Sequence, residues 1–501
     1  MREDLETRSG RRVGREHAVV SGLAALAALR VLASCALFPF FDNVDEAAHF
    51  DVVVKYSRGR PPSGLERYGR ESAQMLALYA TPEYLAPRAA FGGRLPVPFA
   101  ALPPEAAAAG LPGAIAAWTA HANTESQEPP LYYALGGVWL ALGRVVGLAG
   151  VALLYWLRAL NALVAAVLVY LGHAIARAVF PDSKLQRLGV PLLLAVFPQD
   201  AFYSIGSDAL SPLCFGLAFL EIVRFGAGGA PTRGAAARAG LALAATALVK
   251  ASNLPLVGVG AAALGLRARR AAAECGARMA WGRLALAVAC AGAPIGAWLV
   301  WNQLLHGDWT GTTAKVAALG WTRKPLGAWW PHPLFSGAGL FAFGSELLAS
   351  FWRGEFVWRG ERLAHAALDV FYAGSSLVLL GVALLRLPAA REPRRALLFA
   401  ASCFAGGVAF LAVLSLGFDF GRCVYPSRAH PFFTSGRLLG GALIPFLLLY
   451  VHGLDRSLAF TASTRVRALA LLAIAAAATA SELWLDRAPF ASAYNLFHFG
   501  G

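Results

Sequence analysis

The chain has 501 residues, of which 57% are hydrophobic and only 15% are charged. A soluble chain carries about a quarter charged residues, so this composition excludes an ordinary soluble protein and predicts an all-α polytopic membrane protein with about 11–13 transmembrane helices. The formal net charge of +15 is mostly arginine between apolar segments, which is typical of cytoplasmic loops rather than of a nucleic-acid-binding protein.

Residues 1–16 are polar and arginine-rich, and residues 17–41 form the first long apolar run. That run is too long for a signal-peptide core. We therefore expect a cytoplasmic tail followed by a retained transmembrane helix. Residues 42–148 would then form a first extracytoplasmic loop that carries juxtamembrane helices.

An acidic motif follows the first span directly. If the chain is helical after Val44, Asp45 and His49 lie four residues apart on one face, and Glu46 and His49 lie three apart. Such a group can transfer protons, bind a metal ion or cap a helix. The simplest alternative is that Asp42 or Asp45 only caps a helix that lies on the membrane.

The apolar stretch 131–148 is interrupted by Arg144. If both this stretch and the next apolar run spanned the membrane, the basic residues that follow would face outward, against the usual charge distribution. We therefore expect 131–148 to be a juxtamembrane or re-entrant helix. Residues 149–301 are predicted to hold further transmembrane helices, with spans that include 187–203 and 208–226.

The second half of the chain repeats this pattern. Residues 302–365 form a tryptophan-rich extracytoplasmic loop, and aromatic residues at that density favour a membrane interface over a sugar site. Residues 366–485 hold the last transmembrane helices, and residues 486–501 form an outer tail. Within residues 366–485, the loop 417–437 is predicted to lie on the extracytoplasmic side.

The loop 417–437 contains Arg422, Arg428 and Arg437. Arginines on the outer face violate the usual charge distribution, so an anion is needed to explain them, and a lipid phosphate is the natural candidate. The alternative is non-specific binding to lipid headgroups. With acids early and bases late on one face, a cleft between them would place a general base opposite an anionic leaving group.

Several motifs in order resemble the GT-C superfamily of polytopic glycosyltransferases, which includes protein O-mannosyltransferases and aminoarabinose transferases. They are Asp45-Glu46-Ala47-Ala48-His49-Phe50 after the first span, Glu128-Pro129-Pro130-Leu131-Tyr132-Tyr133, Arg158-Ala159-Leu160-Asn161, and Gly421-Arg422-Cys423-Val424-Tyr425-Pro426. Cys423 stands where the family has an aromatic residue, which weakens the alignment of the last motif.

The resemblance implies transfer of a sugar from a polyprenyl-phosphate carrier to an extracytoplasmic glycan, lipid or protein, with inversion. It implies that Asp45 is the base and that Glu46 contacts the acceptor or a metal. His49 would lie behind these acids as a supporting residue or donate a hydrogen bond to the acid. The lipid phosphate would be bound by Arg422, Arg428 and Arg437, with help from Lys55 and Arg58. Glu128, Tyr132, Tyr133 and His430 would lie on the acceptor or sugar side.

The resemblance leaves a divalent cation, Mg or Mn, open, with Asp45 and Glu46 as its ligands. No nucleic acid is expected as a partner; the lipid bilayer is. The abundance of arginine and alanine hints at a GC-rich genome and favours a bacterial inner membrane, with the site on the extracytoplasmic face.

Three alternatives remain open. A flippase or other transporter would favour charges at mid-membrane depth, for which Lys250 and Glu221 are the candidates. A metalloprotease would need His-Glu-x-x-His, but Asp45 stands at the first histidine position. A non-catalytic assembly factor would keep the fold and bind a partner through its outer loops, and replacement of Asp45 would distinguish it from an enzyme.

Overall fold

The computed structural model describes residues 2–84, 86–225, 230–461 and 463–495. The ends of the two predicted tails, residue 1 and residues 496–501, lie outside the described residues. In the first half of the chain the helices are α1 (Arg2–Leu37), α2 (Glu46–Ser57), α3 (Arg70–Tyr79), η1 (Arg88–Phe91), η2 (Phe99–Ala101), α4 (Pro104–Ala120), α5 (Leu131–Val145), α6 (Val151–Val179), α7 (Lys184–Ala195), η3 (Asp200–Phe202), η4 (Ser207–Leu210), α8 (Ser211–Arg224) and α9 (Arg233–Val249).

The second half continues with η5 (Ala251–Asn253), α10 (Leu254–Cys275), α11 (Ala277–His306), α12 (Thr313–Ala318), η6 (Leu326–Ala328), η7 (Pro333–Phe335), α13 (Gly337–Arg353), α14 (Ala366–Leu385), α15 (Arg391–Gly417), η8 (Gly436–Ala442), α16 (Leu443–Ser457), α17 (Thr464–Leu485) and α18 (Arg487–Phe490). The strands are β1 (Thr322–Arg323), β2 (Val357–Trp358), β3 (Glu361–Arg362) and β4 (Phe418–Asp419). β1 pairs with β4 and β2 with β3, both antiparallel.

Seven helical segments among the described residues are long and apolar enough to cross a membrane: Gly14–Leu37, Val151–Val179, Ala277–His306, Ala366–Leu385, Arg391–Gly417, Gly436–Ser457 and Thr464–Leu485. The protein is therefore an all-α, multi-pass integral membrane protein, as the sequence predicts. The spans expected at 187–203 and 208–226 correspond to α7 and α8, which have only 12 and 14 residues, so the total of 11–13 stays a prediction.

Two segments differ in detail from the sequence-based expectation. The predicted span 187–203 is not one helix, because α7 ends at Ala195 and the chain continues into the short turn η3. The tryptophan-rich region 302–365 is not only a loop, since it contains the 17-residue helix α13. One face of α13, including Phe351 and Trp352, is buried in the core of the bundle.

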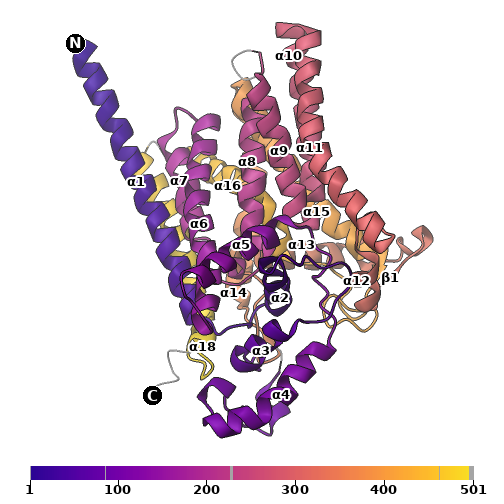
Figure 1. Ribbon diagram of the computed structural model, residues 1–501. Helices are drawn as coiled ribbons and strands as arrows, with labels where there is room; N and C mark the ends of the chain where they lie inside the picture. The colour runs from indigo at the N-terminus through magenta and orange to yellow at the C-terminus, as the bar shows by residue number, and fades with distance from the viewer. Residues whose placement is uncertain (1, 85, 226–229, 462, 496–501) are drawn as a thin grey trace.

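The long helices run roughly side by side, and the N-terminus lies at one end of the bundle (Figure 1). At the opposite end, which we call the loop end, lie α2, α3 and α4 (Figure 1). The segment Gly436–Ser457 is the most buried of the seven, because 89% of its apolar stretch is buried inside the protein. It packs against α7, α14 and α15, so its first residues reach the loop end from the centre of the bundle.

A second apolar cluster lies beneath α2 and α5 at the loop end and includes Phe50, Val53, Tyr133 and Leu157. Pro130 precedes α5, where its missing N–H costs no helical hydrogen bond. Gly137 then allows α5 to approach α2 closely, because a Cβ there would lie 2.9 Å from the backbone nitrogen of Ser57. This packing fixes α2, and with it the acidic motif, against the bundle.

Candidate functional site

Asp45 stands immediately before α2 in a left-handed backbone conformation, with a φ of 62°. Non-glycine residues adopt this conformation rarely, and such residues gather at functional sites. The carboxylate makes no capping hydrogen bond to α2, so capping does not account for it. Instead, Oδ2 accepts a 2.8 Å hydrogen bond from Nη2 of Arg437. The Asp45 side chain is 34% exposed and thus within reach of a ligand.

Arg437 lies at the beginning of the buried segment Gly436–Ser457, which we call the central helix. There it contacts acids from three other segments. Besides Asp45, its Nη1 lies 3.0 Å from Oδ2 of Asp208, and its Nε lies 3.6 Å from Oε2 of Glu355. The other oxygen of Asp208 pairs with Lys250. We call these five residues the Arg437 cluster. Its side chains come from the acidic motif, η4, the end of α13, the end of α9 and η8, so only the tertiary fold brings them together.

A second group of charges joins the two large loops. The Nζ of Lys315 lies 2.7 Å from Oε1 of Glu125 and 2.7 Å from Oε1 of Glu128. Lys315 is carried by α12, whose start is fixed by Asp308 through a hydrogen bond from the backbone nitrogen of Thr313. We call Lys315, Glu125 and Glu128 the Lys315 cluster.

The two clusters act on each other electrostatically. Burial would raise the pKa of Asp45, but the charges of Arg437, His49 and Lys315 outweigh it and lower this pKa to about 2. Burial lowers the pKa of His49 to about 4. Burial raises the pKa of Glu125 to about 7, against the charge of Lys315. At neutral pH, Asp45 is therefore ionised, His49 is uncharged and Glu125 lies near its midpoint.

Glu46 does not have the position expected of an acceptor or metal contact. Its side chain is fully buried, and its two oxygens accept hydrogen bonds from Arg158 at 2.9 and 2.8 Å. The backbone nitrogen of Ile205 donates a third bond, at 3.0 Å, to Oε1. Arg158 is buried as well and donates to the carbonyl oxygens of Cys35, Phe38 and Pro39. Glu46 thus anchors α2 to α6 and to the end of α1.

His49 lies one turn into α2 and contacts the tyrosines of α5 rather than a carboxylate. Its Nδ1 shares a 2.8 Å hydrogen bond with the hydroxyl of Tyr133. Tyr132 packs against the same ring at a centroid distance of 6.5 Å. All three side chains are buried. His49 therefore shares its hydrogen bond with Tyr133 instead of donating to the acid of the motif.

Replacement of Tyr133 by Phe removes the hydroxyl and leaves Nδ1 of His49 buried without this partner. We expect Tyr133→Phe to lower the free energy of unfolding by about 1–3 kcal/mol, because an unsatisfied buried polar group bears its desolvation cost. Chemical unfolding in detergent measures it. Tyr170→Phe, which removes an exposed hydroxyl bonded to Ser21, should change it by less than about 0.5 kcal/mol. Equal effects of the two replacements would contradict the assignment.

The other predicted phosphate contacts lie away from the Arg437 cluster. Lys55 binds Asp51 at 2.9 Å and Glu66 at 3.1 Å, about 15 Å along the helix axis from Asp45. Arg58 binds Glu71 at 2.9 Å. These ion pairs hold the loop between α2 and α3, so the two cations are engaged within the first loop.

The late arginines divide into two kinds. Arg422 is exposed, and Arg428 is exposed with a single ion pair, to Asp419 at 3.2 Å. Arg437 alone enters the cluster with Asp45. His430 lies 3.1 Å from Glu346 and stacks on Tyr425. Of the residues predicted from the sequence, the structure therefore brings Asp45 and Arg437 into contact and places Glu128 in the neighbouring Lys315 cluster.

Asp45 and Glu46 do not fit a divalent cation in this arrangement. The Asp45 carboxylate faces Arg437, whereas both Glu46 oxygens bind Arg158. Within the described ranges, no group of three or more His, Cys, Asp and Glu side chains is placed to hold a metal ion.

Sequence reasoning missed Asp208, Glu355 and Lys315 as site residues and placed Lys250 only as a transporter candidate. One signal was available. The sequence has five lysines, at 55, 184, 250, 315 and 324, against 39 arginines. Lysine is rare in this arginine-rich chain, and two of the five lysines, Lys250 and Lys315, pair with acids in the two clusters.

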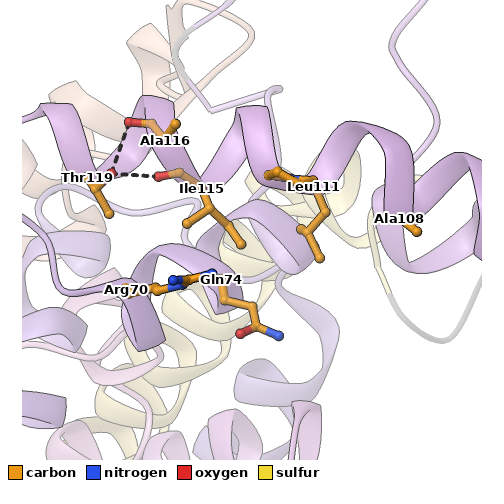
Figure 2. Close-up of a pocket in the computed structure, with 8 residues that line it drawn as sticks. Arg70, Gln74, Ala108, Leu111, Ile115, Ala116 and Thr119 are labelled. Atoms are coloured by element: carbon orange, nitrogen blue, oxygen red, sulfur yellow. Dashed lines mark hydrogen bonds between the residues drawn. The ribbon is translucent and has the colours of Figure 1, made fainter.

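A groove of about 520 Å³ lies apart from both clusters, between α3 and α4. Figure 2 shows Arg70 and Gln74 of α3 facing Leu111 and Ile115 of α4. Thr119 completes the lining with a hydroxyl that donates to the carbonyl oxygens of its own helix. The groove shares no lining residue with the Arg437 cluster or the Lys315 cluster.

A family model described as "Predicted membrane protein (DUF2142)" matches residues 29–422 of this sequence. No curated protein matches it. A crystal structure of the Archaeoglobus fulgidus oligosaccharyltransferase with Zn and sulfate is 14% identical, with a TM-score of 0.37, over 73% of this chain and 44% of that one. A second structure, of AglB from the same archaeon with an inhibitory peptide and a dolichol-phosphate, is 15% identical, with a TM-score of 0.34, over 73% and 48%.

The chain thus spans less than half the length of either oligosaccharyltransferase. A likeness at these TM-scores does not identify an activity.

Proposed function

The chain belongs to the DUF2142 family of predicted membrane proteins, and we propose that it is a membrane glycosyltransferase. In this proposal it moves a sugar from a polyprenyl-phosphate carrier to an extracytoplasmic glycan, lipid or protein, with inversion. The observation that supports the proposal is the contact between Asp45 and Arg437. It places a partly exposed carboxylate against a guanidinium at the N-terminal end of the segment Gly436–Ser457.

The two side chains suit the two ends of such a reaction. A guanidinium offers a planar set of donors that matches phosphate oxygens, and an ionised carboxylate can accept a proton. The acceptor hydroxyl attacks the anomeric carbon on the face opposite the phosphate. The bond between that carbon and the phosphate oxygen breaks, and its electron pair leaves on the phosphate. The hydroxyl proton passes to Asp45.

Donor binding would also make Asp45 a better base. In the free protein, burial would raise the pKa of Asp45, but the charges of Arg437, His49 and Lys315 together hold it at about 2, and Arg437 makes the largest of these contributions. A phosphate that draws Arg437 toward itself removes part of this charge from the carboxylate, and the pKa of Asp45 then rises. The same cation would thus bind the leaving group and activate the base only when the donor is present.

The remaining predicted residues take supporting roles in this proposal. Glu46 and Arg158 hold the acidic motif in place, and His49 with Tyr132 and Tyr133 forms a buried group of rings between α2 and α5. Arg422 and Arg428 are exposed and would bind lipid headgroups. We further propose that the protein lies in the bacterial inner membrane, with the loop end on the extracytoplasmic side.

No specific observation favours the transporter alternative. Lys250 belongs to the Arg437 cluster through its ion pair with Asp208. Glu221 pairs with Arg238 of the next helix at 3.1 Å. Both candidate charges are thus paired with an opposite charge, and such ion pairs are as compatible with an enzyme as with a transporter.

The test is transfer by the purified protein in lipid vesicles. A panel of radiolabelled polyprenyl-phosphate sugars serves as donors, membrane extract as the source of acceptors, and vesicles without protein as the control. We expect label from one donor to leave the carrier and enter the extract. If no donor is turned over and none binds, the proposal fails, and a transporter or an assembly factor becomes the better account.

A further inference from the structure

The two clusters hold more negative than positive groups. Their cations are Arg437, Lys250 and Lys315, and each of them already contacts at least one carboxylate. The acids of the two clusters are Asp45, Asp208, Glu355, Glu125 and Glu128, and Asp200 lies beside them. A donor phosphate brings a further negative charge, and in a buried site that charge needs compensation.

Asp200 and Glu355 form the part of the cluster that can supply this compensation. Oδ2 of Asp200 accepts a 3.0 Å hydrogen bond from the backbone nitrogen of Glu355, so the two residues are adjacent. Both are buried, with exposed fractions of 4% and 6%. Within the described part of the chain, Oδ1 of Asp200, Oε1 of Glu355 and Nε of Arg437 are buried without a hydrogen-bond partner.

Unpartnered carboxylate oxygens in a buried site are stabilised when one of them carries a proton. Burial raises the pKa of Asp200 to about 7, and the nearby charge of Glu355 adds to the rise. Burial also raises the pKa of Glu355, although Arg437 opposes it. The charged groups that act on this pair from the surrounding elements are Arg353 of α13, Arg362 of β3, Asp208 of η4, Arg437 of η8 and Asp486 at the end of α17.

We propose that binding of the donor phosphate is coupled to uptake of one proton by the Asp200–Glu355 pair. The proton neutralises one carboxylate of the pair, which reduces the negative charge that attracts Arg437 and frees the guanidinium for the phosphate. This inference rests on the proposed function, because it concerns the same phosphate. It predicts that the affinity for the lipid phosphate falls as the pH rises, since the bound state holds the additional proton.

The test uses full-length protein in lipid nanodiscs and a short-chain polyprenyl methyl phosphate. This phosphodiester keeps one negative charge over the range studied, so the probe itself takes up no proton. Calorimetric titration near pH 7 in two buffers of different ionisation enthalpy gives the number of protons bound with the lipid. We expect a substantial part of one proton, and a Kd that rises by up to about tenfold per pH unit above neutrality.

The variants are Asp200→Asn and Glu355→Gln, with Asp182→Asn, an exposed aspartate at a turn, as the matched control. We expect the first two to abolish proton uptake and the control to retain it. Binding without proton uptake by the wild-type protein, with or without Mg²⁺, would overturn the inference and leave the proposed function standing. Proton uptake that persists in both variants would overturn the assignment to this pair. Absence of binding at any pH would instead overturn the donor site of the proposed function, and the inference with it.

Discussion

Replacement of Arg437 by Gln should weaken binding of a polyprenyl phosphate by at least about 30-fold, which corresponds to ~2 kcal/mol. Gln is shorter, and it removes the charge and most of the donors that contact Asp45, Asp208 and Glu355. The measurement is the Kd for the lipid phosphate in nanodiscs, at matched amounts of folded protein.

Two controls separate the role of Arg437 in binding from its role in the fold. Arg437→Lys keeps the charge but loses the planar fork, so an intermediate Kd is expected. Arg428→Gln removes an exposed arginine of the same loop, which pairs with Asp419, and should change the Kd by less than about threefold. If Arg428→Gln weakened binding as much as Arg437→Gln, the loop rather than the cluster would hold the phosphate.

The buried pair of Glu46 and Arg158 should govern stability. Arg158→Met leaves the Glu46 carboxylate buried without its counter-ion, and we expect a loss of about 3–5 kcal/mol in the free energy of unfolding. The double variant Arg158→Met/Glu46→Gln should lose less than the sum of the two single losses, because the unpaired charge is removed. Chemical unfolding in detergent measures all three.

Glu71→Gln is the matched control, because Glu71 forms exposed ion pairs with Arg58 and Arg144. Its effect on stability should stay below about 1 kcal/mol. Transfer per folded molecule distinguishes an anchoring role from a catalytic one, since Glu46→Gln should then lose stability rather than turnover. A Glu46→Gln protein that is stable but inactive would restore the role that the sequence motif suggested for Glu46.

The fold class was predictable from the sequence because the apolar composition permits little else. The long helix α6 lies within the region 149–301, and α14 and α15 lie within 366–485, where transmembrane helices were expected. The region of α7 to α10 was harder, because short helices with proline and small residues carry a weaker hydropathy signal. Trp352 belongs to a buried helix face rather than to an interface belt, and composition alone does not distinguish the two.

The candidate site was predictable only at its two ends. Asp45 follows the first span, and Arg437 lies in a loop whose charge contradicts the topology, so each has a local signal. Asp208 and Glu355 have none, because they become neighbours only when η4 and the end of α13 meet at η8. The Glu46 carboxylate lies one residue from Asp45 in the sequence but, unlike Asp45, is buried on Arg158, which spacing along the chain cannot reveal.

The measurement that tests the central claim most directly is sugar transfer by wild-type protein beside Asp45→Asn and the control Asp182→Asn. The amide keeps the shape of the carboxylate but cannot accept the hydroxyl proton. We expect wild type and control to release the sugar equally and Asp45→Asn to be slower by at least about 100-fold at equal folded yield. Equal turnover by Asp45→Asn would contradict the account and remove Asp45 from the reaction.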